Sequence, residues 1–486
     1  MSMDSSPATA VDSSGVDSVV RTQQIIDLER KPIGRLFFQL STPLVFGMLV
    51  QGLYNIVDAI FVSRGVGPLA VGGVSVVFPI QIFIFSMAVL VGHGAASIVT
   101  RLLGAGKYDE ANSVAGNSLL LGIIIAIFLT ASISLFMLPI LSGLSISDAL
   151  LPYAIEYLQP LIYGVIFVFL SSNLTDLLRS EGKMKYLMLI TITSSVLNVI
   201  LDAVFIFGLD MGVSGAALAT VAAQVMSALM AFVFIVRGNT QLKVKWKNLR
   251  VKLATSIDMM TLGSPVFLGH LGFSCTLAVA NYSLANANLP DADIQISAYG
   301  IIGRTFIFMM LPLIGFVTSF KTIVGYNYGA ARFDRVKASI KFGLIVSTIF
   351  TLSMTVVMLF FPEVVVSLFS DDAELIAASV SISKVMFLGW PTISVFMVCS
   401  SYFQAVGKVG PAFMLPLLRV YLLLIPGLVL VPLYIGVEYI WFAYPVADLV
   451  CFLVILLMLG SIRKKKRQSR FNADNEEGVM LTPDAS

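Results

Sequence analysis

"LSTPLVFGMLVQGLYNIVDAIFVS", residues 40–63, is an apolar stretch that contains a single charged residue, Asp58. At a rise of about 1.5 Å per residue, a helix of this length crosses the hydrocarbon core of a bilayer, which is about 30 Å thick. A charged side chain at the centre of such a helix costs at least about 2.5 kcal/mol, so acids in membranes tend to face a cavity and a polar partner. The stretch therefore predicts a membrane-spanning helix with a functional carboxylate.

The composition of the whole chain indicates a multi-pass membrane protein. Of the 486 residues, 57% are hydrophobic and only 12% are charged, whereas a soluble domain has about 25% charged residues. This balance excludes an ordinary soluble enzyme. The apolar stretches predict an all-α protein with about twelve transmembrane helices, because a bilayer offers no partner to an unpaired backbone group. The expected spans are 34–63, 71–99, 113–139, 150–178, 185–208, 213–236, 258–287, 296–322, 337–361, 375–404, 411–434 and 437–462.

The distribution of basic residues indicates which loops are cytoplasmic. If the N-terminus lies inside, 27 of the 31 Lys and Arg residues fall in the tails and the inner loops. Cytoplasmic loops of membrane proteins carry this excess of positive charge. We therefore expect a multi-pass protein of the plasma membrane with both termini in the cytoplasm.

An internal repeat divides the chain into two halves. Each half contains six expected helices, so both halves have the same orientation and are related by a pseudo-two-fold axis along the membrane normal. Two such bundles suit a transporter that works by alternating access. The matching segments, at offsets of 222 to 225 residues, are "LSTPLVFG" (40–47) with "LGSPVFLG" (262–269), "GAGKYDEA" (104–111) with "GAARFDRV" (329–336), and "LRSEGKMK" (178–185) with "FQAVGKVG" (403–410).

The repeat predicts five parts of the chain. We expect a disordered cytoplasmic N-terminal tail (1–33), an N-lobe (34–236), a cytoplasmic linker (237–257), a C-lobe (258–462) and a cytoplasmic C-terminal tail (463–486).

Few acids lie well inside the expected spans, and these acids are the candidates for function. Asp58 is one of them, and Asp202 is another, four residues after Asn198 and therefore on the same helical face. Asp176 is three residues from Arg179, so we expect a local ion pair between them.

Three segments resemble the MATE (multidrug and toxic compound extrusion) family of transporters. They are "LYNIVDAIFVSRGVGPLAVGGVSVVFPI" (53–80), "GAGKYDEA" (104–111) and "VGYNYGAARFD" (324–334). The resemblance extends over roughly residues 34–462. It implies two lobes around a central cleft and the export of cationic amphiphiles in exchange for Na⁺ or H⁺.

Within that family the chain is similar to the branch that resembles the DNA-damage-inducible exporters. The resemblance implies a cation site in the N-lobe, formed by the helix-1 carboxylate, the helix-5 Asn-x-x-x-Asp pair and a helix-6 hydroxyl. It also implies a helix-1 bend at Pro43 and a drug cavity lined by Gln51 and Tyr54. The cation-site residues that match are Asp58, Asn198, Asp202 and Thr220.

Two carboxylates, an amide and a hydroxyl suit either ion. Oxygen ligands favour a hard cation such as Na⁺, and two close carboxylates also favour sharing a proton. A structural role remains open for each residue: Asp58 and Asp202 could hydrogen-bond neighbouring helices, Asn198 could link helices, and Thr220 could belong to small-residue packing. Additional candidates for the substrate cavity are Asn55, Asn281 and Arg304.

The residues together predict a secondary active antiporter for multidrug and xenobiotic efflux, and not an enzyme. We expect a monomer in the lipid bilayer that binds a small organic cation or amphiphile, with H⁺ or Na⁺ as coupling ion, no other cofactor and no nucleic acid. A flippase of lipid-linked saccharides, from the same superfamily, is the first alternative. A membrane-embedded enzyme is the second, although the sequence has no Walker motif, metal motif or nucleophile–base set.

Overall fold

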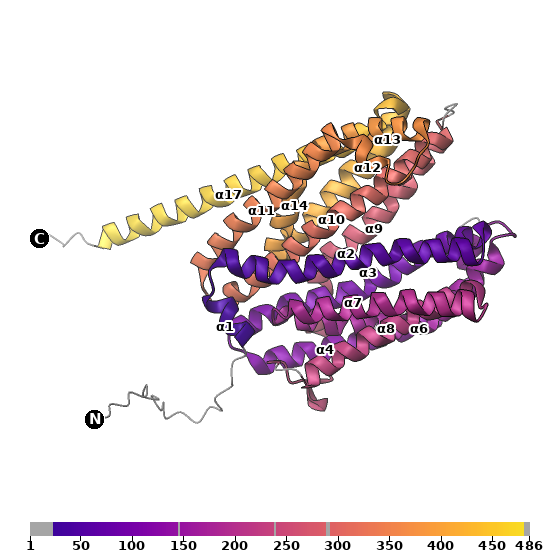
Figure 1. Cartoon of the computed structure of the whole chain (residues 1–486). Coiled ribbons are helices and arrows are strands. Elements are labelled where there is room, and N and C mark those ends of the chain that lie inside the picture. The colour runs from indigo at the N-terminus through magenta and orange to yellow at the C-terminus, as the bar shows by residue number, and fades with distance from the viewer. Residues whose placement is uncertain (1–22, 144–145, 238–239, 288–291, 481–486) are drawn as a thin grey trace, which may run out of the picture.

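The computed structural model describes residues 23–143, 146–237, 240–287 and 292–480, and within these ranges all regular structure is helical (Figure 1). Twelve helical segments are long and apolar enough to cross a membrane. The prediction of about twelve transmembrane helices is thereby confirmed. The expected outermost residues, 1–22 and 481–486, lie outside the described ranges.

The N-lobe contains six spans, two of which are extended by a second helical piece. Its helices are α2 (Ile33–Gly65), α3 (Pro68–Gly104), α4 (Tyr108–Leu135) with α5 (Met137–Gly143), α6 (Leu151–Ser180), α7 (Met184–Asp202) continued by a π-helical turn (Ala203–Gly208), and α8 (Gly212–Arg237).

The C-lobe repeats this arrangement with more interruptions. Its helices are α9 (Leu253–Ala285), α10 (Ala292–Gly329), α11 (Phe333–Phe360) with α12 (Pro362–Val366), α13 (Ala373–Met386) joined by a 3₁₀ turn (Phe387–Gly389) to α14 (Trp390–Ala405), α15 (Val409–Pro416) joined by a π-helical segment (Leu417–Leu424) to α16 (Ile425–Tyr434), and a 3₁₀ turn (Val437–Phe442) followed by α17 (Ala443–Met480).

The expected disordered tail over residues 1–33 is wrong for its last third. Residues Gln23–Arg30 form a short helix, α1, and Leu28 is only 1% exposed. Its backbone carbonyl accepts hydrogen bonds from Asn327 Nδ2 (3.3 Å) and Arg335 Nη2 (3.1 Å), both in the C-lobe. The Leu28 side chain also packs against Gly182 of the N-lobe. These tertiary contacts, which composition does not reveal, order the segment.

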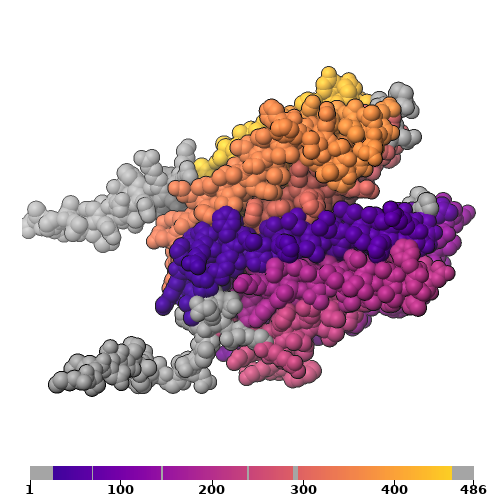
Figure 2. All heavy atoms as spheres, in the orientation of Figure 1, coloured from indigo at the N-terminus to yellow at the C-terminus, as the bar shows by residue number. Residues whose placement is uncertain are grey.

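The two lobes meet along a seam that is closed at one end only. We call the end that carries α1 and the linker the linker end, and the opposite end the far end. One hydrophobic cluster crosses the seam at the linker end and includes Phe37, Leu103, Phe320 and Val324. A second cluster, which includes Val62, Val77 and Ile162, is confined to the far half of the N-lobe. Figure 2 shows the same pattern, because the two lobes touch near the N-terminal side and diverge toward the other end.

Glycines allow the helix backbones to approach closely at the seam. A Cβ atom at Gly94 of α3 would lie 1.8 Å from the Met259 carbonyl oxygen, and one at Gly263 of α9 would lie 1.8 Å from the Leu90 carbonyl oxygen. The ends of α3 and α10 make a reciprocal contact between Gly104 with Tyr326 and Gly329 with Arg101, at equivalent positions of the repeat. These contacts follow the predicted pseudo-two-fold relation.

The same contacts explain why α3 and α10 are longer than expected. We expected spans over 71–99 and 296–322, whereas the helices continue to Gly104 and Gly329. Their last turns are held by packing between the lobes, and not by apolar composition, so hydropathy does not mark where they end.

The linker is fastened to the N-lobe. Within the expected range of 237–257, α8 ends at Arg237 and α9 begins at Leu253, earlier than expected. The Leu242 backbone N–H donates to Glu181 Oε1 (2.8 Å), and the Lys243 N–H donates to Asn112 Oδ1 (2.7 Å). Residues 238–239 lie outside the described ranges.

Glu181 gives this attachment a pH dependence that can be measured. Burial raises the pKa of Glu181 above its ordinary value of 4.5, against the opposing effects of the Leu242 N–H and Lys183. An acid with a raised native pKa loses stability as the pH rises from the unfolded pKa through the native one. We therefore expect the thermal midpoint of Glu181→Gln, relative to wild type, to rise as the pH increases above 4.5 and then level off. A constant difference between the two midpoints across this range would contradict the assignment.

Candidate functional site

Three helices of the N-lobe bring the predicted ion-site residues together. α7 packs against both α2 and α8, and Asn198 and Asp202 share the face of α7 that is 1% and 0% exposed at these residues. In the orientation that satisfies the Asn198 amide, its nitrogen donates to Asp202 Oδ2 (3.2 Å) and its oxygen accepts from the Thr220 backbone N–H (3.3 Å). Thr220 thus meets the cluster through its backbone.

Asp58 reaches this cluster from α2. Its carboxyl group lies within hydrogen-bonding distance of the Asp202 carboxyl group. Two carboxyl groups make this contact only when one of them holds a proton or a cation lies close by. Among the described residues, Asp58 Oδ1 and Asp202 Oδ1 are buried without a hydrogen-bond partner. Each carboxyl group therefore has an oxygen available to a proton or a cation.

Two residues of this region were not predicted from the sequence. Tyr157 of α6 is 3% exposed and lies in the electrostatic range of both Asp58 and Asp202, as does Tyr54 of α2. Gln81 of α3 donates to the Tyr157 hydroxyl (3.4 Å). Gln81 could have been noticed as the one amide in its apolar span, whereas nothing in the local sequence marks Tyr157.

The remaining cavity candidates lie apart from the carboxyl groups. Gln51 and Asn55 are exposed on α2, where Asn55 Nδ2 donates to the Gln51 carbonyl oxygen (3.0 Å). Asn281 of α9 and Arg304 of α10 are exposed. These positions leave a role in substrate binding open but do not add ligands to the carboxyl pair.

Pro43 lies inside α2, which runs without interruption from Ile33 to Gly65. A proline has no backbone N–H, so the carbonyl four residues earlier loses its helical partner and the helix is weakened at this point. The bend at Pro43 remains a prediction.

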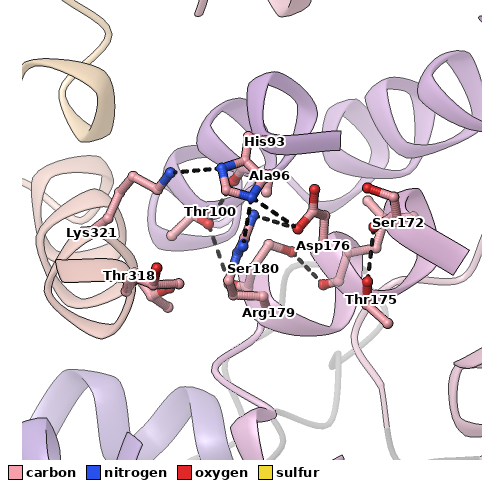
Figure 3. Close-up of polar contacts among 12 residues, drawn as sticks. His93, Ala96, Thr100, Ser172, Thr175, Asp176, Arg179, Ser180, Thr318 and Lys321 are labelled. Atoms are coloured by element: carbon pink, nitrogen blue, oxygen red, sulfur yellow. Dashed lines mark hydrogen bonds and ion pairs between the residues drawn. The ribbon is translucent and has the colours of Figure 1, made fainter. Parts of the chain in front are cut away.

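A second polar cluster lies at the seam, nearer the linker end (Figure 3). We call it the seam cluster: His93 of α3, Asp176 and Arg179 of α6, and Lys321 of α10. Asp176 and Arg179 form the expected ion pair, and Arg179 Nη1 lies 2.9 Å from His93 Nε2. His93 and Lys321 were not predicted as functional, because only the fold brings α10 of the C-lobe against α3 and α6 of the N-lobe.

The C-lobe holds a different arrangement in its interior. Arg419 Nε donates to Asp448 Oδ1 (2.6 Å), and Asp448 is 4% exposed. This acid already has a cationic partner from its own lobe, unlike the carboxyl pair in the N-lobe. The described residues contain no group of three or more His, Cys, Asp and Glu side chains that could hold a metal ion.

Comparison with protein families gives one match that extends over both lobes. A family model described as MatE matches residues 43–204 and 265–430, two segments of similar length that together make up more than half of the chain. One segment lies in each lobe, in agreement with the repeat.

Comparison with curated proteins finds relatives of nearly the same length. The multidrug export protein MepA of Staphylococcus haemolyticus (strain JCSC1435) is 26% identical over 451 residues, which cover 92% of this chain and 97% of that protein. MepA of Staphylococcus aureus (strain MSSA476) is 25% identical over 447 residues, with 92% and 98% covered.

Solved structures share the fold. The MATE multidrug transporter DinF-BH, solved as a drug complex, has a TM-score of 0.84 and 33% identity, and the alignment covers 91% of this chain and 99% of that chain. An outward-facing MATE family transporter of the MOP superfamily has a TM-score of 0.83 and 24% identity, with 91% and 98% covered. The two-lobe fold predicted from the sequence is thereby confirmed.

Proposed function

This chain belongs to the MatE family of multidrug efflux transporters, and from this premise we propose that it exports organic cations and related amphiphiles in exchange for H⁺ or Na⁺. Family membership makes the chain a transporter and not an enzyme. Its twelve candidate spans make it a multi-pass membrane protein. We further propose that it is a monomer of the plasma membrane and that the linker end faces the cytoplasm.

The observation that carries the coupling proposal is the contact between Asp58 and Asp202, each with one buried oxygen that has no partner among the described residues. Such a pair can alternate between binding an ion and holding a shared proton, because two ionised carboxylates at this distance repel each other. Asn198 orients Asp202, and the Thr220 backbone fixes Asn198. The pair fits either coupling ion.

The proposed cycle starts with the lobes apart at the far end, the arrangement in Figure 2. Substrate occupies the cleft between the lobes, with Gln51 and Tyr54 in the lining. Binding of H⁺ or Na⁺ at Asp58 and Asp202 shifts α2, with Pro43 as the point of bending, and the cavity loses affinity for substrate. Ion and substrate thus favour different states of one cavity, which is the thermodynamic requirement for exchange.

Support for a small-molecule substrate comes from the relatives. MepA is named a multidrug export protein, and DinF-BH is named a multidrug transporter and was solved with a drug bound. On this basis we propose a comparable class of substrates for this chain, without assigning a particular compound.

The test is dye transport by the purified full-length chain in proteoliposomes. We expect ethidium movement when a pH gradient or a Na⁺ gradient is imposed, and loss of that movement when an ionophore dissipates the gradient. A pH gradient in Na⁺-free buffer separates the two coupling ions. Ethidium movement that is equal with and without any gradient, or absent under both gradients, would contradict ion-coupled export.

A further inference from the structure

His93 lies between two basic side chains at the seam, one from each lobe (Figure 3). Arg179 Nη1 of the N-lobe is 2.9 Å from His93 Nε2, and Lys321 Nζ of the C-lobe is 3.4 Å from His93 Nδ1. The side chains of Arg179 and Asp176 are 8% and 6% exposed, and Lys321 is 9% exposed. The contact between the lobes therefore includes several buried ionisable groups.

The hydrogen bonds of His93 determine where its proton lies. A guanidinium group only donates, so the imidazole nitrogen facing Arg179, Nε2, must accept. A neutral imidazole has one donor and one acceptor, and its proton is therefore on Nδ1. Because Nδ1–H donates toward Lys321 Nζ, the Lys321 nitrogen must accept. An ammonium group has no lone pair, so the closed seam requires Lys321 as a neutral amine.

The other contact of Lys321 is compatible with a neutral amine. Nζ lies 3.4 Å from Gln404 Oε1 of α14, which accepts one of the amine N–H groups. Asp176 and Arg179 then balance each other in charge. A small cavity of about 10 Å³, about the space that one water molecule needs, is lined by polar residues from both lobes that include Thr100 and Lys321.

Addition of one proton changes this network. The proton binds to the lone pair of Lys321 Nζ, and the ammonium group then donates to His93 Nδ1. The imidazole proton must move to Nε2, where it opposes the Arg179 N–H and turns toward Asp176, whose Oδ1 lies 3.7 Å away. Asp176 Oδ2 is buried without a hydrogen-bond partner among the described residues and is therefore available to accept. The seam thus gains a buried positive charge and loses the Arg179–His93 bond, which is unfavourable away from water.

The charged and titratable groups around the cluster come from both lobes. Those that act on Lys321 and His93 are His93 itself on α3, Asp176 and Arg179 on α6, and His270 on α9. Arg101 of α3 lies in the same seam, where Asp258 of α9 and Tyr328 of α10 act on it and its Nη1 donates to the Ala405 carbonyl oxygen (3.0 Å). Within this set, only Lys321 belongs to the C-lobe and contacts His93 directly.

We propose that the seam cluster is a proton-binding site, separate from Asp58 and Asp202, which releases the contact between the lobes at the linker end. The seam is closed while Lys321 is neutral, and a proton taken up from the aqueous phase at the linker end opens it. The site makes inward opening depend on the pH of that compartment. This inference rests on the proposed movement of the lobes but not on the ion site at Asp58.

The experiment measures the distance across the linker end in full-length protein in nanodiscs. Spin labels replace two exposed lysines, Lys107 of the N-lobe and Lys337 of the C-lobe, after Cys275, Cys399 and Cys451 are replaced by Ala. All variants carry Asp58→Asn and Asp202→Asn, so that any response to pH arises outside the ion site. We expect the long-distance population to increase as the pH is lowered from about 9 to about 6, between the ordinary pKa ranges of lysine and histidine.

Variants of Lys321 then identify the responsible group. Lys321→Gln should keep the short distance at every pH, and Lys321→Arg, which is always charged, should give the long distance at every pH. His93→Gln, whose amide donates and accepts regardless of pH, should also remove the response and replaces Lys321→Gln if that variant does not fold. Lys384→Gln, at a lysine of α13, is the matched control and should respond as the parent does.

Two results would overturn the proposal. One is a response of the Lys321→Gln variant, or of the His93→Gln variant, equal to that of the parent. The other is a parent without any response to pH. Either result leaves ion-coupled dye transport by the wild type untouched, so failure of this inference is distinguishable from failure of the proposed function.

Discussion

Replacement of Asp58 by Asn is expected to abolish gradient-driven ethidium efflux while the protein still folds. Asn has the shape of Asp but cannot ionise, so the pair with Asp202 can no longer exchange a proton or bind a cation by charge. Coupling free energies between two sites are typically about 1–3 kcal/mol. We therefore expect a loss of about 5- to 150-fold in the gradient-dependent rate, with the thermal midpoint near that of the wild type.

The same substitution at Asp202 should have an equal or larger effect. Asp202 is 0% exposed and is the partner of both Asp58 and Asn198. The matched control is Asp371→Asn, because Asp371 is an exposed acid of the far end of the C-lobe and should transport as the wild type does. If Asp58→Asn and Asp371→Asn transport ethidium at the same rate under the same gradient, the N-lobe carboxyl pair is not the coupling site.

The residues that sequence could identify are those whose signal is local. Asp58 is a lone acid in an apolar helix, and Asn198 and Asp202 are one helical turn apart, so their chemistry is visible along a single segment. The twelve spans are visible for the same reason, because each must be apolar over about 20 residues to cross a bilayer.

The residues that sequence could not identify depend on contacts between segments far apart in the chain. Lys321 looks like an ordinary basic residue at an inner loop until α10 places it beside His93, 228 residues away. Tyr157 is one of 15 tyrosines, and only the packing of α6 beside α2 and α7 brings it to the carboxyl pair. α1 is similar, because its order comes from bonds to Asn327 and Arg335.

The second large effect is expected where α3 and α9 cross. Gly263→Ala places a Cβ atom 1.8 Å from the Leu90 carbonyl oxygen, and a backbone oxygen cannot move aside by changing rotamer. The helices must separate or the seam must open. Overpacking of this kind typically costs about 1–3 kcal/mol, and the cost applies only while the linker end is closed.

The variant is therefore expected to shift the lobes toward the state that is open at the linker end, as well as to lower the thermal midpoint. The distance between labels at Lys107 and Lys337 measures the shift, with a change of about 5- to 150-fold in the ratio of the two populations. Gly269→Ala is the matched control on the same helix, since a Cβ atom there meets nothing within 4 Å. Equal populations in the Gly263→Ala and Gly269→Ala variants would show that the lobes do not part at this crossing.

The Gly263 and Lys321 variants act on the same equilibrium from opposite directions. Gly263→Ala penalises the closed linker end by steric contact at any pH, whereas Lys321→Gln favours the closed end by keeping the seam cluster without an added charge. Because the two positions lie in different contacts of one seam, combining them should restore a distance distribution between those of the single variants. An additive outcome of this kind is expected only if both contacts open in the same rigid movement of the lobes.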